Sequence, residues 1–117
     1  MSYVNAAALP VKTARKQDYQ KIAAEMAAVF KKHGAAHVME CWGEDVPDGK
    51  ITSFPKGLKL KADETVVLSL VIWPSKTAAD AGMKAVMEDA SMGPHSSAAL
   101  FDRTRTIFGA FDPIVEL

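Results

Sequence analysis

The sequence has very little cysteine and no net charge, and each shortage excludes a class of protein. Cys41 is the single cysteine, so the chain forms no internal disulfide, which is consistent with a reducing compartment. Fourteen basic residues balance fourteen acidic ones. A neutral chain lacks the positive surface that holds a polyphosphate backbone, so we expect no nucleic-acid partner.

Long apolar runs are also missing, and we expect no leader segment. No apolar run approaches the roughly 18 residues that a membrane span requires. The opening residues, MSYVNAAALPVK, place no basic stretch ahead of the apolar ones, unlike a secretory signal peptide. We therefore expect a cytoplasmic protein without a membrane partner. Its 117 residues of globular composition are expected to form a single domain, 1–117.

What the chain does contain is an alternation of strand and helix patterns. Apolar residues from Tyr19 to Phe30 recur at helical spacing, which predicts a helix over 14–33 that ends at Gly34. Ser75 is expected to cap a second helix, over 76–89. Strands are expected over 2–11, 36–43, 65–73 and 103–111, with an irregular edge strand over 53–61.

The order of these elements, β-α-β-β-α-β, is that of the ferredoxin-like α+β fold, in which two helices cover one face of a four-stranded antiparallel sheet. From Val66 to Trp73 every residue except Ser69 is apolar, so this strand needs cover on both faces. The chain has no predicted element left for the second face. A second copy is the simplest cover, so we expect a homodimer through the sheet face. The alternative is a half-exposed apolar sheet, which favours aggregation.

Several strings in the chain are similar to those of one bacterial family. They are ECWGEDVPDGKITSFP, DETVV, WPSK, and FD followed by R-x-I-x-G-x-F, and the likeness covers nearly the whole chain. On these strings the chain resembles the YbaA-like bacterial proteins, a family of unknown function in the dimeric α/β-barrel superfamily. The chain departs from that family at Asn5, where an aspartate is usual, and at Arg103 and Thr104, where glycine and lysine are usual.

The resemblance implies that two ferredoxin-like sheets face each other in a dimeric α/β barrel. That superfamily includes antibiotic-biosynthesis-type monooxygenases, muconolactone isomerases and haem-dependent enzymes. The resemblance implies the fold more strongly than any chemistry, because one fold supports many functions. If the family has a catalytic acid at position 5, Asn5 keeps only its shape and hydrogen bonding.

Four polar residues interrupt strands that are otherwise apolar, and such exceptions are the informative ones in a buried sheet. They are Asn5, Glu40, Ser69 and Arg105. Because side chains alternate along a strand, Glu40 and Trp42 lie on one face, and Met39 and Cys41 on the other. We expect Glu40 and Trp42 to face the barrel between two copies, and Met39 and Cys41 to face the helices.

Two interpretations of these residues are open. In the functional one, Glu40 is a general base or hydrogen-bond acceptor, and Arg105 anchors an anionic or carbonyl group of a ligand. In the structural one, Glu40 and Arg105 form a buried ion pair with satisfied polar neighbours. The ligand-binding candidates are Asn5, Glu40, Trp42, Ser69, Arg105 and Phe111.

No cofactor or metal site is predicted. Cys41 has no activating base beside it, because His37 lies four residues away along the strand, so we interpret it as a small buried hydrophobe. His33 and His95 also lack the spacing of metal or haem ligands. The acidic turn EDVPDGK lacks the alternating oxygen ligands of a calcium loop. The segment 91–102 could be a lid or an unstructured connector.

Two hypotheses of function follow. The first is a homodimer that binds or converts a small, partly apolar carbonyl or phenolic molecule in the barrel, as a cofactor-independent monooxygenase or isomerase. The second is a non-catalytic homodimeric binding or interaction module with a packed barrel. A cavity of roughly 300 Å³ or more would favour the first. Leu68 and Leu70 are large enough to fill the barrel, whereas Gly109 and Ala110 would leave space.

Overall fold

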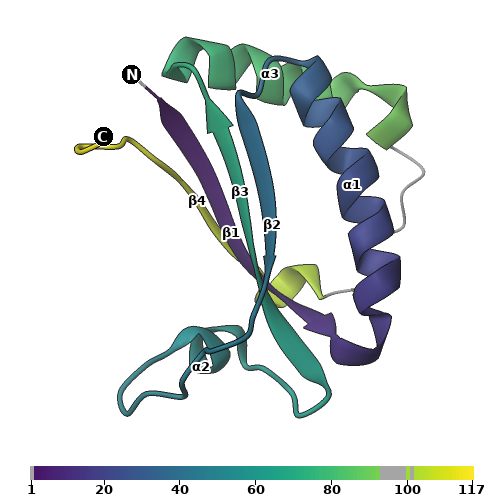
Figure 1. Cartoon of the computed structure of the whole chain (residues 1–117), viewed down its shortest axis with the longest axis vertical. Helices are drawn as coiled ribbons and strands as arrows, with labels where there is room; N and C mark the ends of the chain where they lie inside the picture. Colours follow the sequence, from purple (N-terminus) through teal and green to yellow (C-terminus); the bar gives the residue numbers. More distant parts are fainter. Residues whose placement is uncertain (1, 93–99, 101) are drawn as a thin grey trace.

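Four strands form one antiparallel sheet in the computed structural model, which describes residues 2–92, 100 and 102–117 (Figure 1). The sheet order is β2-β3-β1-β4, the ferredoxin-like arrangement that the element order predicts. The two longest strands therefore occupy the centre. Their bounds are β1, Tyr3–Lys12; β2, His37–Trp42; β3, Glu64–Trp73; and β4, Ile107–Phe111.

Helices α1 (Lys16–Lys32) and α3 (Lys76–Glu88) lie on the same side of the sheet, as predicted (Figure 1). The apolar stripe of α1 packs on the sheet, and Gly34, at φ +107°, follows its end. The Ser75 hydroxyl accepts a 3.0 Å hydrogen bond from the Ala78 amide and so caps α3. Short 3₁₀ turns cover Thr13–Arg15, Ala90–Met92 and Arg103–Arg105.

The segment predicted as an irregular strand over 53–61 contains a short helix instead, α2 (Phe54–Leu58). The Ser53 hydroxyl caps it by accepting a 3.1 Å bond from the Lys56 amide, and a proline is tolerated in the first turn. Leu58 is fully buried against Ala8 and Val66, on the face away from α1 and α3. The expectation that no element covers this second face is therefore wrong at one end of the sheet.

The last strand is shorter than predicted, because residues 103–105 form a 3₁₀ turn. The Asp102 side chain caps this turn by accepting a 2.9 Å bond from the Thr104 amide. Strand alternation therefore does not extend back to Arg105. Within the segment that could be a lid, 93–99 and 101 lie outside the described residues.

Register across the strands sets which side chains share a face. Glu40, Ser69, Ala7 and Phe108 pair in one row, on the side of α1 and α3. On the opposite side, which we term the open face, α2 is the one described helix, and it covers one end. The open face is formed by Val4, Ala6, Ala8, His37, Met39, Cys41, Val66, Leu68, Leu70, Ile72, Ile107, Gly109 and Phe111.

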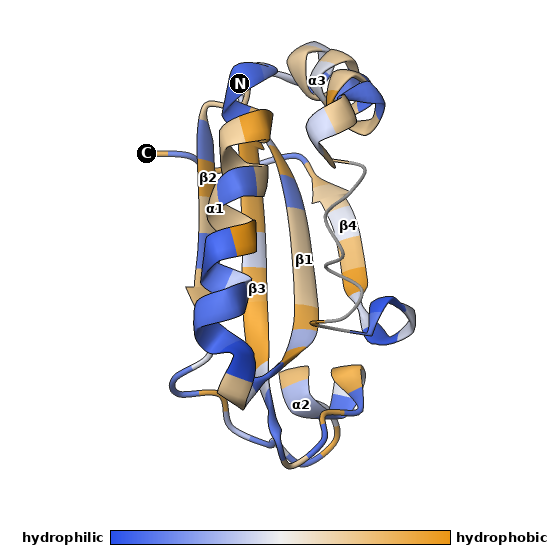
Figure 2. Cartoon of the chain, turned by 90° about the vertical axis from the view of Figure 1, so that its right-hand side faces the viewer, coloured by the Kyte–Doolittle hydropathy of each residue, from blue (hydrophilic) through white to orange (hydrophobic). Residues whose placement is uncertain are grey.

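Figure 2 shows that β3 is hydrophobic along most of its length and that α1 lies in front of it. The core between helices and sheet includes Val67, Val71 and Trp73, all from β3. Within residues 2–92, 100 and 102–117, the structure contains no helix with the length and apolar character of a membrane span.

Candidate functional site

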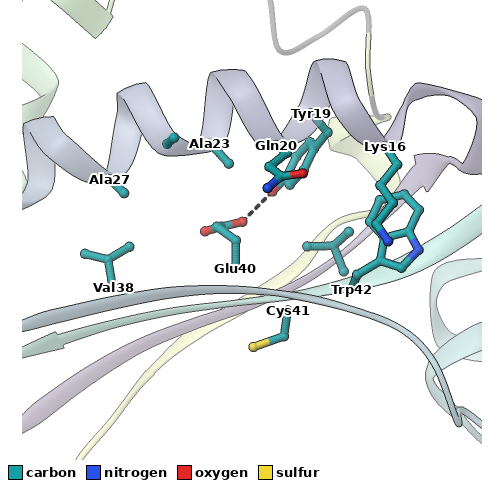
Figure 3. A pocket seen from close by; sticks show the side chains of 11 residues that line it. Lys16, Tyr19, Gln20, Ala23, Ala27, Val38, Glu40, Cys41 and Trp42 are labelled. Atoms are coloured by element: carbon teal, nitrogen blue, oxygen red, sulfur yellow. Dashed lines mark hydrogen bonds between the residues drawn. The ribbon is translucent and has the colours of Figure 1, made fainter.

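Glu40 and Trp42 face helix α1, not a barrel between two copies, so the predicted faces of β2 are reversed. The Tyr19 hydroxyl on α1 donates a 2.5 Å hydrogen bond to Glu40 Oε1, and Trp42 packs against the core cluster around Leu9. Figure 3 shows Glu40 directed toward the helix and Cys41 directed away from it. Both faces of β2 carry apolar side chains, so its sequence alone does not distinguish them.

Glu40 is the centre of a short hydrogen-bonded relay. Its Oε1 accepts from Tyr19 on α1, and its Oε2 accepts a 2.5 Å bond from the Ser69 hydroxyl on β3. Burial raises the pKa of Tyr19, and the hydrogen bond to Glu40 and its charge raise it further. The phenol therefore stays protonated and acts as a donor. A carboxylate has about four lone-pair sites, so Glu40 can still accept a hydrogen bond from a ligand.

The Glu40 side chain lines a pocket of about 450 Å³ between α1 and β2 (Figure 3). Glu40 is solvent-exposed within it, so its charge is not removed from water as predicted. The small alanine side chains on α1 leave room between the helix and β2, and Trp42 forms an apolar wall of the pocket. Lys16 Nζ lies 5.4 Å from the centre of the Trp42 ring, a cation–π contact at the pocket. The other apolar lining residues include Ala23, Ala24, Ala27, Val38 and Val67.

Arg105 does not pair with Glu40, so the structural interpretation, a buried Glu40–Arg105 ion pair, is wrong. Its guanidinium donates two bonds to Glu64, of 2.8 and 2.7 Å, and its Nε donates a 3.1 Å bond to Asp102. The Arg105 and Glu64 side chains are only 14% and 6% exposed. The Arg105 hydrogen bonds lower the pKa of Glu64 to about 2. Arg105 thus holds the segment before β4 to the start of β3. Its N–H groups donate to Glu64 and Asp102 of this chain and not toward a ligand pocket.

The remaining candidates lie on both faces of the sheet. Asn5 is on the helix side, where its Oδ1 accepts a 2.7 Å bond from the Trp73 indole. Ser69 is on the same side, in the relay, whereas Phe111 is 58% exposed on the open face. The structure therefore brings together Glu40, Trp42 and Ser69, but not Phe111 or Arg105.

Sequence reasoning missed the contributions of α1 to this pocket. Helical periodicity places Tyr19 in the apolar stripe, but a buried tyrosine also carries a hydroxyl that needs a partner. Lys16 lies about one turn earlier, so helical spacing places it on the same side of α1. A polar atom within an inner helical stripe is the signal that could have identified this site.

Cys41 is exposed on the open face, so the interpretation as a buried hydrophobe is wrong for the single chain. His95 lies outside the described residues. In the described part of the chain, no three histidine, cysteine or acidic side chains converge as a metal site would require.

Comparison with known proteins gives the family and the fold. The family described as "Protein of unknown function (DUF1428)" matches residues 2–103. The Escherichia coli K12 protein "Uncharacterized protein YbaA" is 38% identical over 116 residues, which cover 99% of both chains. Its counterpart in Shigella flexneri matches to the same extent.

Two solved structures share the architecture. A mutant of SnoaB, a cofactor-independent oxygenase from Streptomyces nogalater, gives a TM-score of 0.66 at 16% identity, over 99% of this chain and 96% of that one. A dimeric ferredoxin-like protein from an uncultured marine organism gives 0.61 at 9% identity, over 99% and 98%. At these identities the two structures show a common fold only.

Proposed function

The chain belongs to the DUF1428 family of unknown function, and we propose that it binds a small, partly apolar carbonyl or phenolic molecule between α1 and β2. The observation that carries this proposal is the 450 Å³ pocket with the Glu40 relay in it. Its volume lies in the range of ligand pockets, and its few polar groups stand among apolar walls.

The chemistry that suits this pocket is removal of a proton. A phenol O–H, or a C–H beside a carbonyl, would give its proton to the Glu40 carboxylate, and the electrons of the broken bond would stay on the ligand. The resulting anion would lie near the positive charge of Lys16. Such an anion can be reprotonated elsewhere, as in an isomerase, or can react with dioxygen. SnoaB is a cofactor-independent oxygenase, and its reaction type is compatible with this step.

A homodimer through the open face is part of the proposal. Met39 and Phe111 on the open face are 38% and 58% exposed. A standard interface takes about 800 Å² from each partner. Such an interface would bury the apolar side chains of Met39, Leu70 and Phe111 on the open face. The pocket between α1 and β2 lies on the opposite side of the sheet and would remain accessible.

The open face also supports the second candidate, a non-catalytic homodimeric module. Its side chains Leu70, Met39 and Phe111 would pack between two sheets without leaving a barrel cavity. The two candidates share the dimer and differ in whether the α1–β2 pocket has a ligand.

A panel of small phenols and ketones, screened by thermal shift, tests the proposed ligand. A ligand at 100 times its Kd adds about 2.7 kcal/mol of stability to the protein. Hits are then compared by calorimetry between wild type and Glu40→Gln. Glu44→Gln is the matched control, because Glu44 is an exposed glutamate just after β2 and outside the pocket.

We expect Glu40→Gln to lower the affinity for the hits at least tenfold and Glu44→Gln to leave that affinity unchanged. Equal binding by all three proteins would contradict the role of Glu40. A panel without hits, with the dimer intact, would favour the non-catalytic module. Consumption of a hit together with dioxygen, or its isomerisation without dioxygen, would identify the reaction.

A further inference from the structure

A second hollow lies on the helix side of the sheet, apart from the α1–β2 pocket. Its volume is about 400 Å³, and β1 and β4 form its floor. Ala7 and Ala110 on these strands have side chains too small to fill the space. Phe30 from α1 and Met83 from α3 supply apolar walls. Figure 2 shows α1 in front of β3 and α3 near the upper end of β4.

Asn5 lines this hollow, and its amide NH₂ group has no partner among the described residues. The Trp73 indole nitrogen can only donate, and it donates to Asn5 Oδ1 at 2.7 Å. Because Trp73 is fully buried, this bond fixes the orientation of the Asn5 amide. No side chain of the described residues accepts a hydrogen bond from Asn5 Nδ2. Every side-chain nitrogen or oxygen that is fully buried among these residues has a partner, so an atom without one is in contact with solvent. Nδ2 is therefore accessible, and Asn5 lines the hollow.

Ser69 is the second polar group of the hollow. Its hydroxyl hydrogen is used in the bond to Glu40, so toward a ligand Ser69 can only accept. Among the described residues that line the hollow, the Asn5 NH₂ group is thus the donor that remains available to a ligand. A ligand that fits these groups has an acceptor oxygen on an apolar body.

We propose that this hollow is a binding site for a small aromatic ketone or aldehyde, whose carbonyl oxygen accepts from Asn5 Nδ2. The ring would lie against Phe30 and Met83, over the floor of Ala7 and Ala110. The assignment goes beyond the α1–β2 pocket and does not depend on it. Asn5 is then a specificity-determining residue, because an amide donor selects a carbonyl acceptor over a group that can only donate.

The two tryptophans allow the two sites to be observed separately. Trp42 lines the α1–β2 pocket, and Trp73 donates to Asn5. We would titrate ¹⁵N-labelled protein with acetophenone and follow both indole N–H signals by NMR. The control probe is α-methylstyrene, which has the same shape and a CH₂ group in place of the carbonyl oxygen. We expect acetophenone to shift the Trp73 signal and α-methylstyrene to bind several-fold more weakly.

Two variants test the site itself. Asn5→Asp keeps an oxygen for Trp73 but removes the donor, and should weaken acetophenone binding about tenfold or more. Ala110→Leu should fill the hollow and abolish binding, whereas Ala28→Leu, an exposed change on α1 outside both cavities, should not. If Asn5→Asp fails to fold, Ala110→Leu still decides, because Ala110 is exposed on the edge strand β4.

Three results would overturn the proposal. They are equal binding of the two probes, binding that Ala110→Leu leaves unchanged, and a response of Trp42 without one of Trp73. The last result would place the ketone in the α1–β2 pocket and so support the proposed function while removing this one. A response of Trp73 that persists in Glu40→Gln would establish the second site by itself.

Discussion

Two glutamates of this chain are in opposite situations, and the difference lies in their partners. Glu64 is 6% exposed and meets the guanidinium of Arg105 through two hydrogen bonds. Glu40 is exposed in a pocket, where its two partners are the neutral donors Tyr19 and Ser69. A buried charge with a matched partner is a structural feature, whereas a solvated carboxylate beside apolar walls is available to a ligand.

The paired glutamate predicts how stability depends on pH. Hydrogen bonds from Arg105 lower the pKa of Glu64 from 4.5 to about 2. A group with a lowered pKa stabilises the fold above its unfolded pKa, and this contribution is lost as the pH falls from about 4.5 to about 2. We expect the free energy of unfolding, measured with urea, to fall across this range. In Glu64→Gln the fall should be smaller, and an equal fall in both proteins would contradict the assignment.

Mutation of the same pair tests its energetic coupling. Removing one member of a buried ion pair costs about 3 to 5 kcal/mol, because the other charge is left without a partner. We expect this loss in Arg105→Met, and the double variant with Glu64→Gln should recover part of it. Asp18→Asn, which removes an exposed pair with Arg15, should cost about 1 kcal/mol or less. Additive single losses, measured by chemical denaturation, would show that the pair is not coupled.

At the scale of elements, close packing of α3 on β3 depends on one glycine. A Cβ atom at Gly82 would overlap the Trp73 ring and would lie 2.9 Å from the backbone oxygen of His33. Trp73 is fully buried and also meets Phe30 edge-to-face, with ring centres 6.2 Å apart. The glycine thus lets α3, β3 and the end of α1 converge on one indole ring.

Substitution of this glycine should destabilise the protein, although alanine favours helices. Helix propensity alone would make Gly82→Ala stabilising by about 1 kcal/mol. The overlap with Trp73 instead costs about 1 to 3 kcal/mol, as overpacking of a core does. We therefore expect a lower melting temperature for Gly82→Ala. Ala81→Gly, an exposed neighbour, should show the propensity effect alone, and a higher melting temperature for Gly82→Ala would refute the packing argument.

The whole molecule is less compact than its mass requires. Its radius of gyration is 14.7 Å, compared with about 13.4 Å for a compact chain of 117 residues. Among the described elements, α2 covers only one end of the open face. Leu70, which pairs with Met39 and Ala6, is not part of the cluster around α2.

The oligomeric state tests this interpretation of the open face. We expect wild type to sediment as a dimer at micromolar concentration. Leu70→Lys should sediment as a monomer or aggregate, because dimerisation would remove the lysine charge from water at a large cost in free energy. Met87→Lys is the matched control, since Met87 is 79% exposed on α3 and should leave the dimer intact. A wild-type monomer would rule out the proposed assembly.

The sequence by itself determined the element order and hence the fold. Helical stripes such as that of α1, and the apolar run of β3, are local periodic patterns that specify a helix or a strand wherever the chain folds. The cap at Ser75 and the stop at Gly34 are equally local. The short helix α2 was missed because Pro55 and Gly57 suggest irregular structure, while the Ser53 cap depends on the actual backbone.

Only the tertiary structure decided the site. Strand alternation specifies which residues share a face, but not which face the helices cover. If that face is chosen wrongly, Glu40 and Trp42 are both assigned to the wrong side of the sheet. Tyr19 settles that choice, because its hydroxyl on α1 reaches Glu40 across 21 positions of the chain. The position of Arg105 was not predictable for a similar reason. Arg105 lies in the turn capped by Asp102 instead of in β4, and its guanidinium donates to Glu64. Such contacts join residues far apart in sequence, and no periodicity encodes them.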